Sequence, residues 1–132
     1  VRLFYFLLML IVAPWATAGD GTNPTNFKAV DEELGNPLRQ PGRKEFEALA
    51  KRGFKSILNL RNYHSDLKLI RGLELKEFRC GVNTGSVTEK DLLNAVRIVR
   101  DAPKPLLIHC WHGSDRTGTV VAAFRIAVQN WE

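Results

Sequence analysis

The chain has 132 residues and a formal net charge of +5 at neutral pH, which is enough for one modest domain around a single hydrophobic core. Its Lys and Arg residues do not cluster with aromatic residues, so this charge does not indicate nucleic-acid binding. A mildly basic surface instead favours phosphorylated or otherwise anionic substrates.

The first 18 residues have the pattern of a signal peptide. Arg2 supplies a short positive region, residues 3–13 are almost entirely apolar, and Ala16-Thr17-Ala18 fits a small-residue cleavage site. The apolar run is too short to favour a membrane span, although an uncleaved N-terminal anchor stays open as an alternative. We therefore expect residues 1–18 to be removed, which leaves one domain over 19–132, exported to a bacterial periplasm and without a membrane span.

Hydrophobic spacing and turn residues predict alternating strands and helices. Phe46, Leu49 and Ala50 recur with helical spacing, and Thr88 with Asp91 fits a capping box at the start of a later helix. The expected elements are an edge strand at 27–30, a turn at 36–42, a helix at 44–51 closed by Gly53, strands at 54–60 and 78–82, a helix at 88–99, a strand at 106–109 and a helix at 117–129. This order predicts an α/β fold with crossover connections and a mostly parallel sheet.

The run from His109 to Gly118 lies between a buried apolar strand and the last helix. It carries a thiol, Cys110, near its start and Arg116 near its end. Loop N–H groups, together with the free N–H groups and positive dipole end of the following helix, suit a tetrahedral dianion. Arg116 offers parallel donors to two phosphate oxygens, and the same field lowers the pKa of Cys110 from about 8.5 toward roughly 3.5–7.5. A thiolate that faces a phosphoryl group predicts transfer through a phosphocysteine.

With His109 before the cysteine and Thr117 after the arginine, this run resembles the Cys-x5-Arg-Thr/Ser signature of the protein tyrosine and dual-specificity phosphatases, bacterial exported branch. The resemblance implies a phosphatase-like central sheet, mostly parallel and flanked by helices, with the signature loop between a strand and a helix and with no cofactor. The Thr117 hydroxyl can hydrogen-bond the thiolate and help the phosphocysteine to leave. The implied phosphate-binding residues are Trp111, His112, Gly113, Ser114, Asp115 and Arg116, and the implied catalytic residues are Cys110, Arg116, Thr117 and Asp115.

The general acid is the point where the sequence departs from the family. The resemblance places an Asp on a loop before the cysteine, but residues 81–87 contain no Asp or Glu. Asp115 lies inside the signature loop, as in the myotubularin-type lipid phosphatases that this loop variant resembles, or it is a solvated residue that offsets Arg116. Glu89 and Asp91 follow residues 81–87, and Asp91 is more simply explained by capping. Asp66 is the most remote candidate.

Three further residues have competing interpretations. Arg61 follows a core strand at the sheet edge where ligands bind, but we expect it to be solvated, as most arginines are. A disulfide between Cys80 and Cys110 would suit an exported protein, and because Cys110 is the expected nucleophile, any such bond should be reversible. His109, Cys110 and His112 lack a second pair of ligands, so we expect no metal site.

The leading hypothesis is a cysteine-dependent phosphatase that acts on phosphotyrosine or phosphoserine/threonine proteins. A phosphoinositide or inositol-phosphate phosphatase is the second hypothesis, favoured by Asp115 and its basic neighbours. A phosphate-binding pseudophosphatase is the third, favoured by the loop without an acid. Because relatives of this branch continue beyond the last helix, we also expect the chain to be incomplete after Glu132.

Overall fold

The computed structural model describes residues 27–30, 33–37, 39–83, 85–111 and 115–132. The expected signal peptide and three residues of the signature loop, His112, Gly113 and Ser114, lie outside the described residues. The elements are β1 (Phe27–Ala29), β2 (Leu34–Pro37), α1 (Arg43–Lys51), β3 (Ser56–Asn59), β4 (Lys76–Arg79), α2 (Glu89–Asp101), β5 (Leu106–His109) and α3 (Asp115–Ala127).

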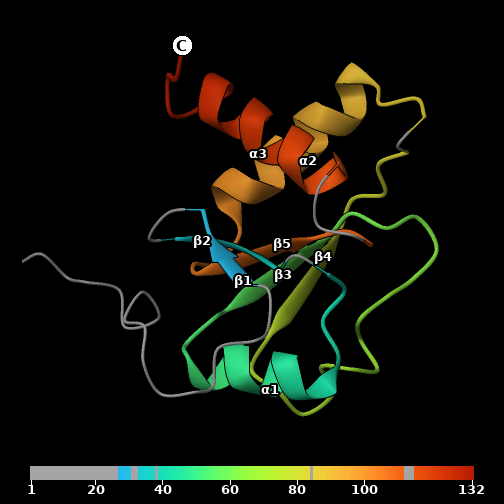
Figure 1. Cartoon of the computed structure of the whole chain (residues 1–132), viewed down its shortest axis with the longest axis vertical. Helices are drawn as coiled ribbons and strands as arrows, with labels where there is room; N and C mark the ends of the chain where they lie inside the picture. The colour runs from blue at the N-terminus through green and yellow to red at the C-terminus, as the bar shows by residue number, and fades with distance from the viewer. Residues whose placement is uncertain (1–26, 31–32, 38, 84, 112–114) are drawn as a thin grey trace, which may run out of the picture.

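The described strands form one sheet between two helical layers. Their order is β1-β2-β5-β3-β4, and β2, β5, β3 and β4 run parallel while β1 is antiparallel to β2. Figure 1 shows α1 on one face of the sheet and α2 with α3 on the other. The predicted α/β class with a mostly parallel sheet and flanking helices is therefore confirmed, as is the predicted edge strand near residue 27.

The two central strands supply both cores because successive side chains of a strand point to opposite faces. In β5, Leu106 and Ile108 pack with α2 and α3, whereas Leu107 packs with Phe46 and Leu49 of α1. All residues of β3 and β5 are buried, as expected for parallel strands covered on both sides.

Helix α1 ends as its glycine predicts. Gly53 adopts φ +91°, its N–H donates to the Ala50 carbonyl at 3.0 Å, and the Phe54 N–H donates to the Leu49 carbonyl at 3.1 Å. These two bonds form a Schellman motif, which needs the left-handed conformation that glycine adopts without strain. The motif turns the chain from α1 into β3.

Two predictions about the strands are wrong. The stretch Asn36-Pro37 was expected to be a turn, but it ends β2 and pairs with β1; Gly, Asn and Pro suggest a turn locally, yet Pro is tolerated near a strand end. The strand expected at 78–82 is centred earlier, at Lys76–Arg79, because its register is set by β3, with Ser56 opposite Lys76. No helix within the described residues is long and apolar enough to cross a membrane.

Candidate active site

Strand β5 delivers Cys110 to the carboxyl edge of the sheet. The thiol side chain is only 2% exposed and packs in the same cluster as Val120 and Val121 of α3. Helix α3 begins at Asp115, two residues earlier than expected, so its free N-terminal N–H groups follow the signature loop directly. Cys110 thus occupies the position between a buried strand and a helix N-terminus that the sequence predicts.

Arg116 and Thr117, in the first turn of α3, complete the described part of the loop. The Arg116 Nη1 donates to the Leu60 carbonyl oxygen at 3.4 Å, and the Leu60 N–H donates to the His109 carbonyl at 2.9 Å. The guanidinium therefore lies at the carboxyl ends of β3 and β5, the edge of the sheet that carries the cysteine. Thr117 is fully buried, and within the described part of the chain its Oγ1 has no hydrogen-bond partner. A buried hydroxyl normally has one, so this oxygen is available to a further group.

Beneath Cys110, on the face covered by α1, the structure gathers buried polar side chains that the sequence interpretation did not connect. Asp66 is fully buried. Its Oδ2 lies 2.5 Å from His109 Nε2, and its Oδ1 accepts from Arg61 Nη2 at 2.9 Å and from Gln40 Nε2 at 3.0 Å. The other ring nitrogen of His109, Nδ1, lies 3.3 Å from the Cys110 carbonyl oxygen. The carboxylate thus joins three segments under the nucleophile.

A second layer holds this group in place. Asn59, the last residue of β3, accepts on Oδ1 from the Arg61 N–H at 3.0 Å and donates from Nδ2 to Glu77 Oε1 at 3.0 Å. Glu77 Oε1 also accepts from the Asp66 N–H at 2.7 Å. The expectation that Arg61 is solvated is therefore wrong: it is 7% exposed because Asp66 and Asn59 satisfy its donors inside the protein. The available sequence signal was Asn59, a polar residue at the end of a buried strand.

Trp111 forms an aromatic rim next to the cysteine. Its ring is 49% exposed and lies 6.0 Å from the Arg61 guanidinium carbon and 6.0 Å from the His64 ring. Both distances are within the range of cation–π and aromatic contacts. Trp111 therefore covers Arg61 on the solvent side and still offers ring surface to a bound molecule.

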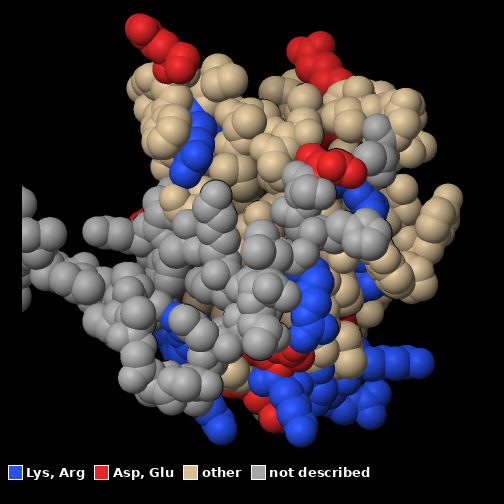
Figure 2. Space-filling view, viewed as in Figure 1, with Lys and Arg blue, Asp and Glu red and all other residues tan. Residues whose placement is uncertain are grey.

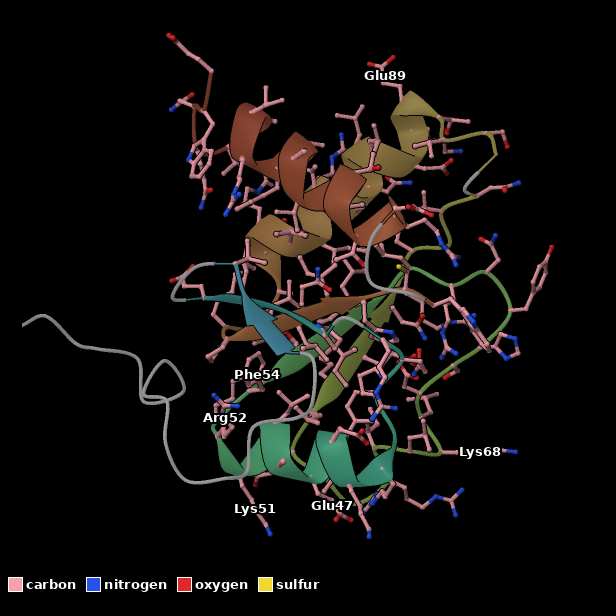
Figure 3. The ribbon with its side chains drawn as sticks, in the orientation of Figure 1. Glu47, Lys51, Arg52, Phe54, Lys68 and Glu89 are labelled. Atoms are coloured by element: carbon pink, nitrogen blue, oxygen red, sulfur yellow. The ribbon has the colours of Figure 1, made fainter. Side chains whose placement is uncertain are left out.

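The structure separates the four acid candidates. Asp91 is held as a capping residue, as predicted: its Oδ2 accepts from the Thr88 hydroxyl at 2.7 Å and from the Thr88 N–H at 3.2 Å. The Thr88 side chain, followed by the Thr88 backbone, lowers the pKa of Asp91, so this carboxyl is a poor proton donor. Glu89 stands at the outer end of α2 and points away from the sheet (Figure 3). Asp66 is occupied by its three partners. Asp115, exposed in the first turn of α3, remains beside the loop.

The two cysteines are not placed for a disulfide. Both are free thiols. Cys80 follows β4 and Cys110 follows β5, with β3 between these strands. The two cysteines are therefore separated by two strand spacings of about 4.8 Å each. Together these spacings exceed the Cα separation of about 4.4–6.8 Å that a disulfide needs. Burial, and then the charge of Asp91, raises the pKa of Cys80, which makes its thiol less reactive. A Cys80–Cys110 bond would require the backbone to move.

Charge and cavities do not indicate a competing centre. Among the described residues, no group of three or more His, Cys, Asp or Glu side chains could hold a metal ion. A cavity of about 430 Å³ along α3, lined by residues such as Val121, Arg125 and Trp131, includes neither Cys110 nor Arg116. Figure 2 shows Lys and Arg side chains gathered over α1 at the lower end of this face, while the part over α2 and α3 is mostly uncharged.

A parallel sheet that carries a cysteine at its carboxyl edge, followed by a helix whose first turn holds an arginine and a threonine, defines a phosphatase-type α/β domain. Residues 35–129 match the family model described as "Polymorphic toxin system, DSP-PTPase phosphatase". The chain therefore belongs to the dual-specificity and tyrosine phosphatase superfamily, as its signature predicts.

Individual relatives agree with this assignment. The chain is 33% identical over 123 residues to inositol diphosphatase DSP5 of Arabidopsis thaliana, a match that covers 82% of this chain and 56% of that protein. A stretch of 48 residues is 40% identical to the dual specificity protein phosphatase TpbA of Pseudomonas aeruginosa, covering 35% of this chain and 22% of TpbA. The chain thus spans about half the length of DSP5.

Solved structures show the same architecture. The core catalytic domain of the PP-IP phosphatase SIW14 from S. cerevisiae is 29% identical, with a TM-score of 0.72 over 83% of this chain and 69% of that one. The P. aeruginosa TpbA structure has a TM-score of 0.74 at 24% identity, over 90% of this chain and 73% of that one, which is a likeness of fold.

Proposed function

We propose that the protein is a phosphoric monoester hydrolase that works through a phosphocysteine on Cys110. The observation that carries this proposal is the placement of Cys110 at the carboxyl end of buried β5, with Arg116 at the same edge and, in the first turn of α3, a buried Thr117 hydroxyl that has no partner among the described residues. A dianion there meets helix N–H groups and a guanidinium fork.

The chemistry follows in two displacements. The Cys110 thiolate attacks phosphorus, the bond from phosphorus to the leaving oxygen breaks, and that oxygen takes the electron pair together with a proton from an acid, for which Asp115 is the proposed donor. Water then attacks phosphorus, gives up a proton to the Asp115 carboxylate left by the first step, and displaces the thiolate to release inorganic phosphate. The Thr117 hydroxyl stabilises that departing thiolate by donating a hydrogen bond to it.

The first substrate class that we propose is a phosphotyrosine or phosphoserine/threonine protein. The named activity of TpbA supports it, and a TpbA variant has been solved in complex with pTyr. On this chain the half-exposed Trp111 ring adds support, because it offers an apolar surface for an aromatic leaving group beside the nucleophile.

A second candidate is the hydrolysis of inositol phosphates. The specific observation in its favour is that a curated relative matching 82% of this chain is an inositol diphosphatase. The SIW14 domain, which matches 83% of this chain, is a PP-IP phosphatase.

The experiment that tests the proposal is a phosphate-release assay over phosphopeptides and inositol phosphates, with Cys110→Ser as the control. The serine hydroxyl is not ionised in the same environment, so turnover should disappear while vanadate binding remains. Turnover by the serine variant near the wild-type rate would refute the phosphocysteine route. If the wild-type protein binds vanadate but hydrolyses no substrate, it is a phosphate-binding pseudophosphatase.

We also propose export to a bacterial periplasm. The proposal depends on Arg2, the apolar run at 3–13 and the Ala16-Thr17-Ala18 site. N-terminal sequencing of protein recovered from the periplasmic fraction should begin at Gly19. Recovery from the cytosol with residues 1–18 intact would contradict it.

A further inference from the structure

His109 is hydrogen-bonded through both ring nitrogens, and each of them faces an acceptor. Nε2 meets the Asp66 carboxylate at 2.5 Å, and Nδ1 meets the Cys110 carbonyl oxygen at 3.3 Å. A neutral imidazole has only one N–H to donate, so a ring that donates to both acceptors carries a proton on each nitrogen. The ring is fully buried, which means that water does not take the place of either partner.

We propose that Asp66 is a positioning residue for the nucleophile: it keeps His109 doubly protonated and fixed, so that Nδ1–H holds the Cys110 carbonyl oxygen and a positive charge lies directly before the thiolate. This inference rests on the proposed phosphocysteine function. Asp66 acts through His109 and does not touch the substrate.

The charges around the ring are consistent with this assignment. Asp66 and Arg61 face the site from the β3–β4 connection, Glu77 joins them from β4, and α1 contributes the uncharged Phe46, whose ring centroid is 6.3 Å from that of His109. With a protonated His109, the charges of Arg61 and His109 offset those of Asp66 and Glu77, and each carboxylate accepts hydrogen bonds from its neighbours. A buried charge is tolerated under these conditions.

The geometry also explains why these residues are buried at all. Asp66 lies 43 positions before His109, and its contacts tie the segment around Gln40, the β3–β4 connection and β5 into one unit beneath Cys110. Catalytic side chains must be held close to their working geometry by packed neighbours. Leu107 orients β5 by packing, whereas Asp66 fixes the end of β5 by directed bonds.

The experiment compares Asp66→Asn with Glu77→Gln in the full chain. Both remove one carboxylate from the same cluster and both should lower the melting temperature, but only Asp66 contacts His109. We expect Asp66→Asn to lower kcat on para-nitrophenyl phosphate by about tenfold or more, with KM nearly unchanged, because the nucleophile and not the binding site is displaced. Glu77→Gln should lower kcat much less.

The second measurement needs no turnover, so it separates this inference from the proposed function. The rate of Cys110 alkylation by iodoacetamide, assigned by peptide mass spectrometry to exclude Cys80, is followed against pH. Loss of the protonated ring should move the midpoint of this curve upward by about half a pH unit or more in Asp66→Asn, and Glu77→Gln should not move it. Removing a carboxylate that acted directly on the thiolate would move the midpoint downward.

A double-variant cycle completes the test. In a His109→Asn background, Asp66→Asn should no longer shift the alkylation midpoint, because the residue through which it acts is gone. A downward or absent shift in Asp66→Asn, an equal shift in Glu77→Gln, or an undiminished shift in the His109→Asn background would each overturn the inference. An upward midpoint shift with no phosphate release from any substrate would support the positioning role and contradict only the proposed hydrolase.

Discussion

At the residue scale, a substitution of Arg116 can test whether the shape of its guanidinium group or only its charge is needed. Replacing it with Lys keeps one positive charge but loses the fork that can bind two phosphate oxygens. We expect Arg116→Lys to lower kcat/KM on para-nitrophenyl phosphate by more than about tenfold, or roughly 1.4 kcal/mol. The matched control is Arg97→Lys, an exposed arginine on α2, which should leave kcat/KM nearly unchanged. A smaller loss in Arg116→Lys would mean that Arg116 is not the phosphate clamp.

The proton donor is a second question at this scale, and the leaving group is the probe. Para-nitrophenolate leaves without a proton, whereas a tyrosine or inositol oxygen needs one. Asp115→Asn should therefore slow hydrolysis of phosphotyrosine and inositol phosphates by about 10²-fold or more, spare the nitrophenyl ester and remove the basic limb of the pH–rate profile.

Glu89→Gln is the control for that variant, because Glu89 lies at the outer end of α2 and points away from the sheet (Figure 3). It should behave as wild type with both kinds of substrate. Phosphotyrosine hydrolysis at the wild-type rate in Asp115→Asn would remove Asp115 as the acid.

At the scale of elements, Asp91 was a candidate catalytic acid, but its carboxyl stabilises helix α2 as a capping group. The Thr88 bonds hold the pKa of Asp91 below its usual value, so the ionised carboxylate stabilises the fold. That contribution is fully present above the unfolded pKa, about 3.9, and is lost as the pH falls through the lower folded pKa. Asp91 therefore acts as a capping residue at the N-terminus of α2 and not as the catalytic acid.

Asp91→Asn should accordingly lower the melting temperature at neutral pH, and the difference from wild type should narrow as the pH falls below about 3.9. Thermal unfolding followed by circular dichroism at several pH values measures this. Glu89→Gln, in the same helical turn but without a bond to Thr88, should change the melting temperature less. A pH-independent difference for Asp91→Asn would show that its charge is not what stabilises the cap.

At the scale of the whole molecule, two cores share the central strands. The core on the α1 face contains Leu107, and the core on the α2–α3 face contains Ile108, its neighbour in sequence. A substitution that weakens either core therefore destabilises the same strand, β5. The sheet couples the unfolding of the two helical layers, and the site lies at the carboxyl edge of this sheet.

Leu107→Ala and Ile108→Ala should each lower the free energy of unfolding by about 2–5 kcal/mol, and each variant should still unfold in a single transition. Urea unfolding followed by tryptophan fluorescence and by far-ultraviolet circular dichroism tests this, since the two curves should coincide. Leu67→Ala, at an exposed position, is the control with little expected loss. Separate transitions by the two probes would show that the layers unfold independently.

Much of the fold could be predicted from the sequence because its signals are local. An apolar run, a capping box and a glycine at a helix end each act within a few residues. They predict β5, α2 and the end of α1, and the spacing of Cys110 and Arg116 predicts where the loop lies. Strand β2 was missed since its Gly, Asn and Pro favour a turn until β5 and β1 pair with it.

The buried cluster could be decided only by the tertiary structure. Apart from the polar Asn59, no residue near Arg61 in the sequence indicates that this arginine is buried. Its burial depends on Asp66, on Asn59 and on the strand order that brings β3 beside β5. The same order places β3 between the two cysteines, which sets them too far apart for the disulfide that the sequence left open. The physical reason is that burial of a polar group is favourable only when distant partners satisfy it, and those partners are chosen by the packing of the sheet.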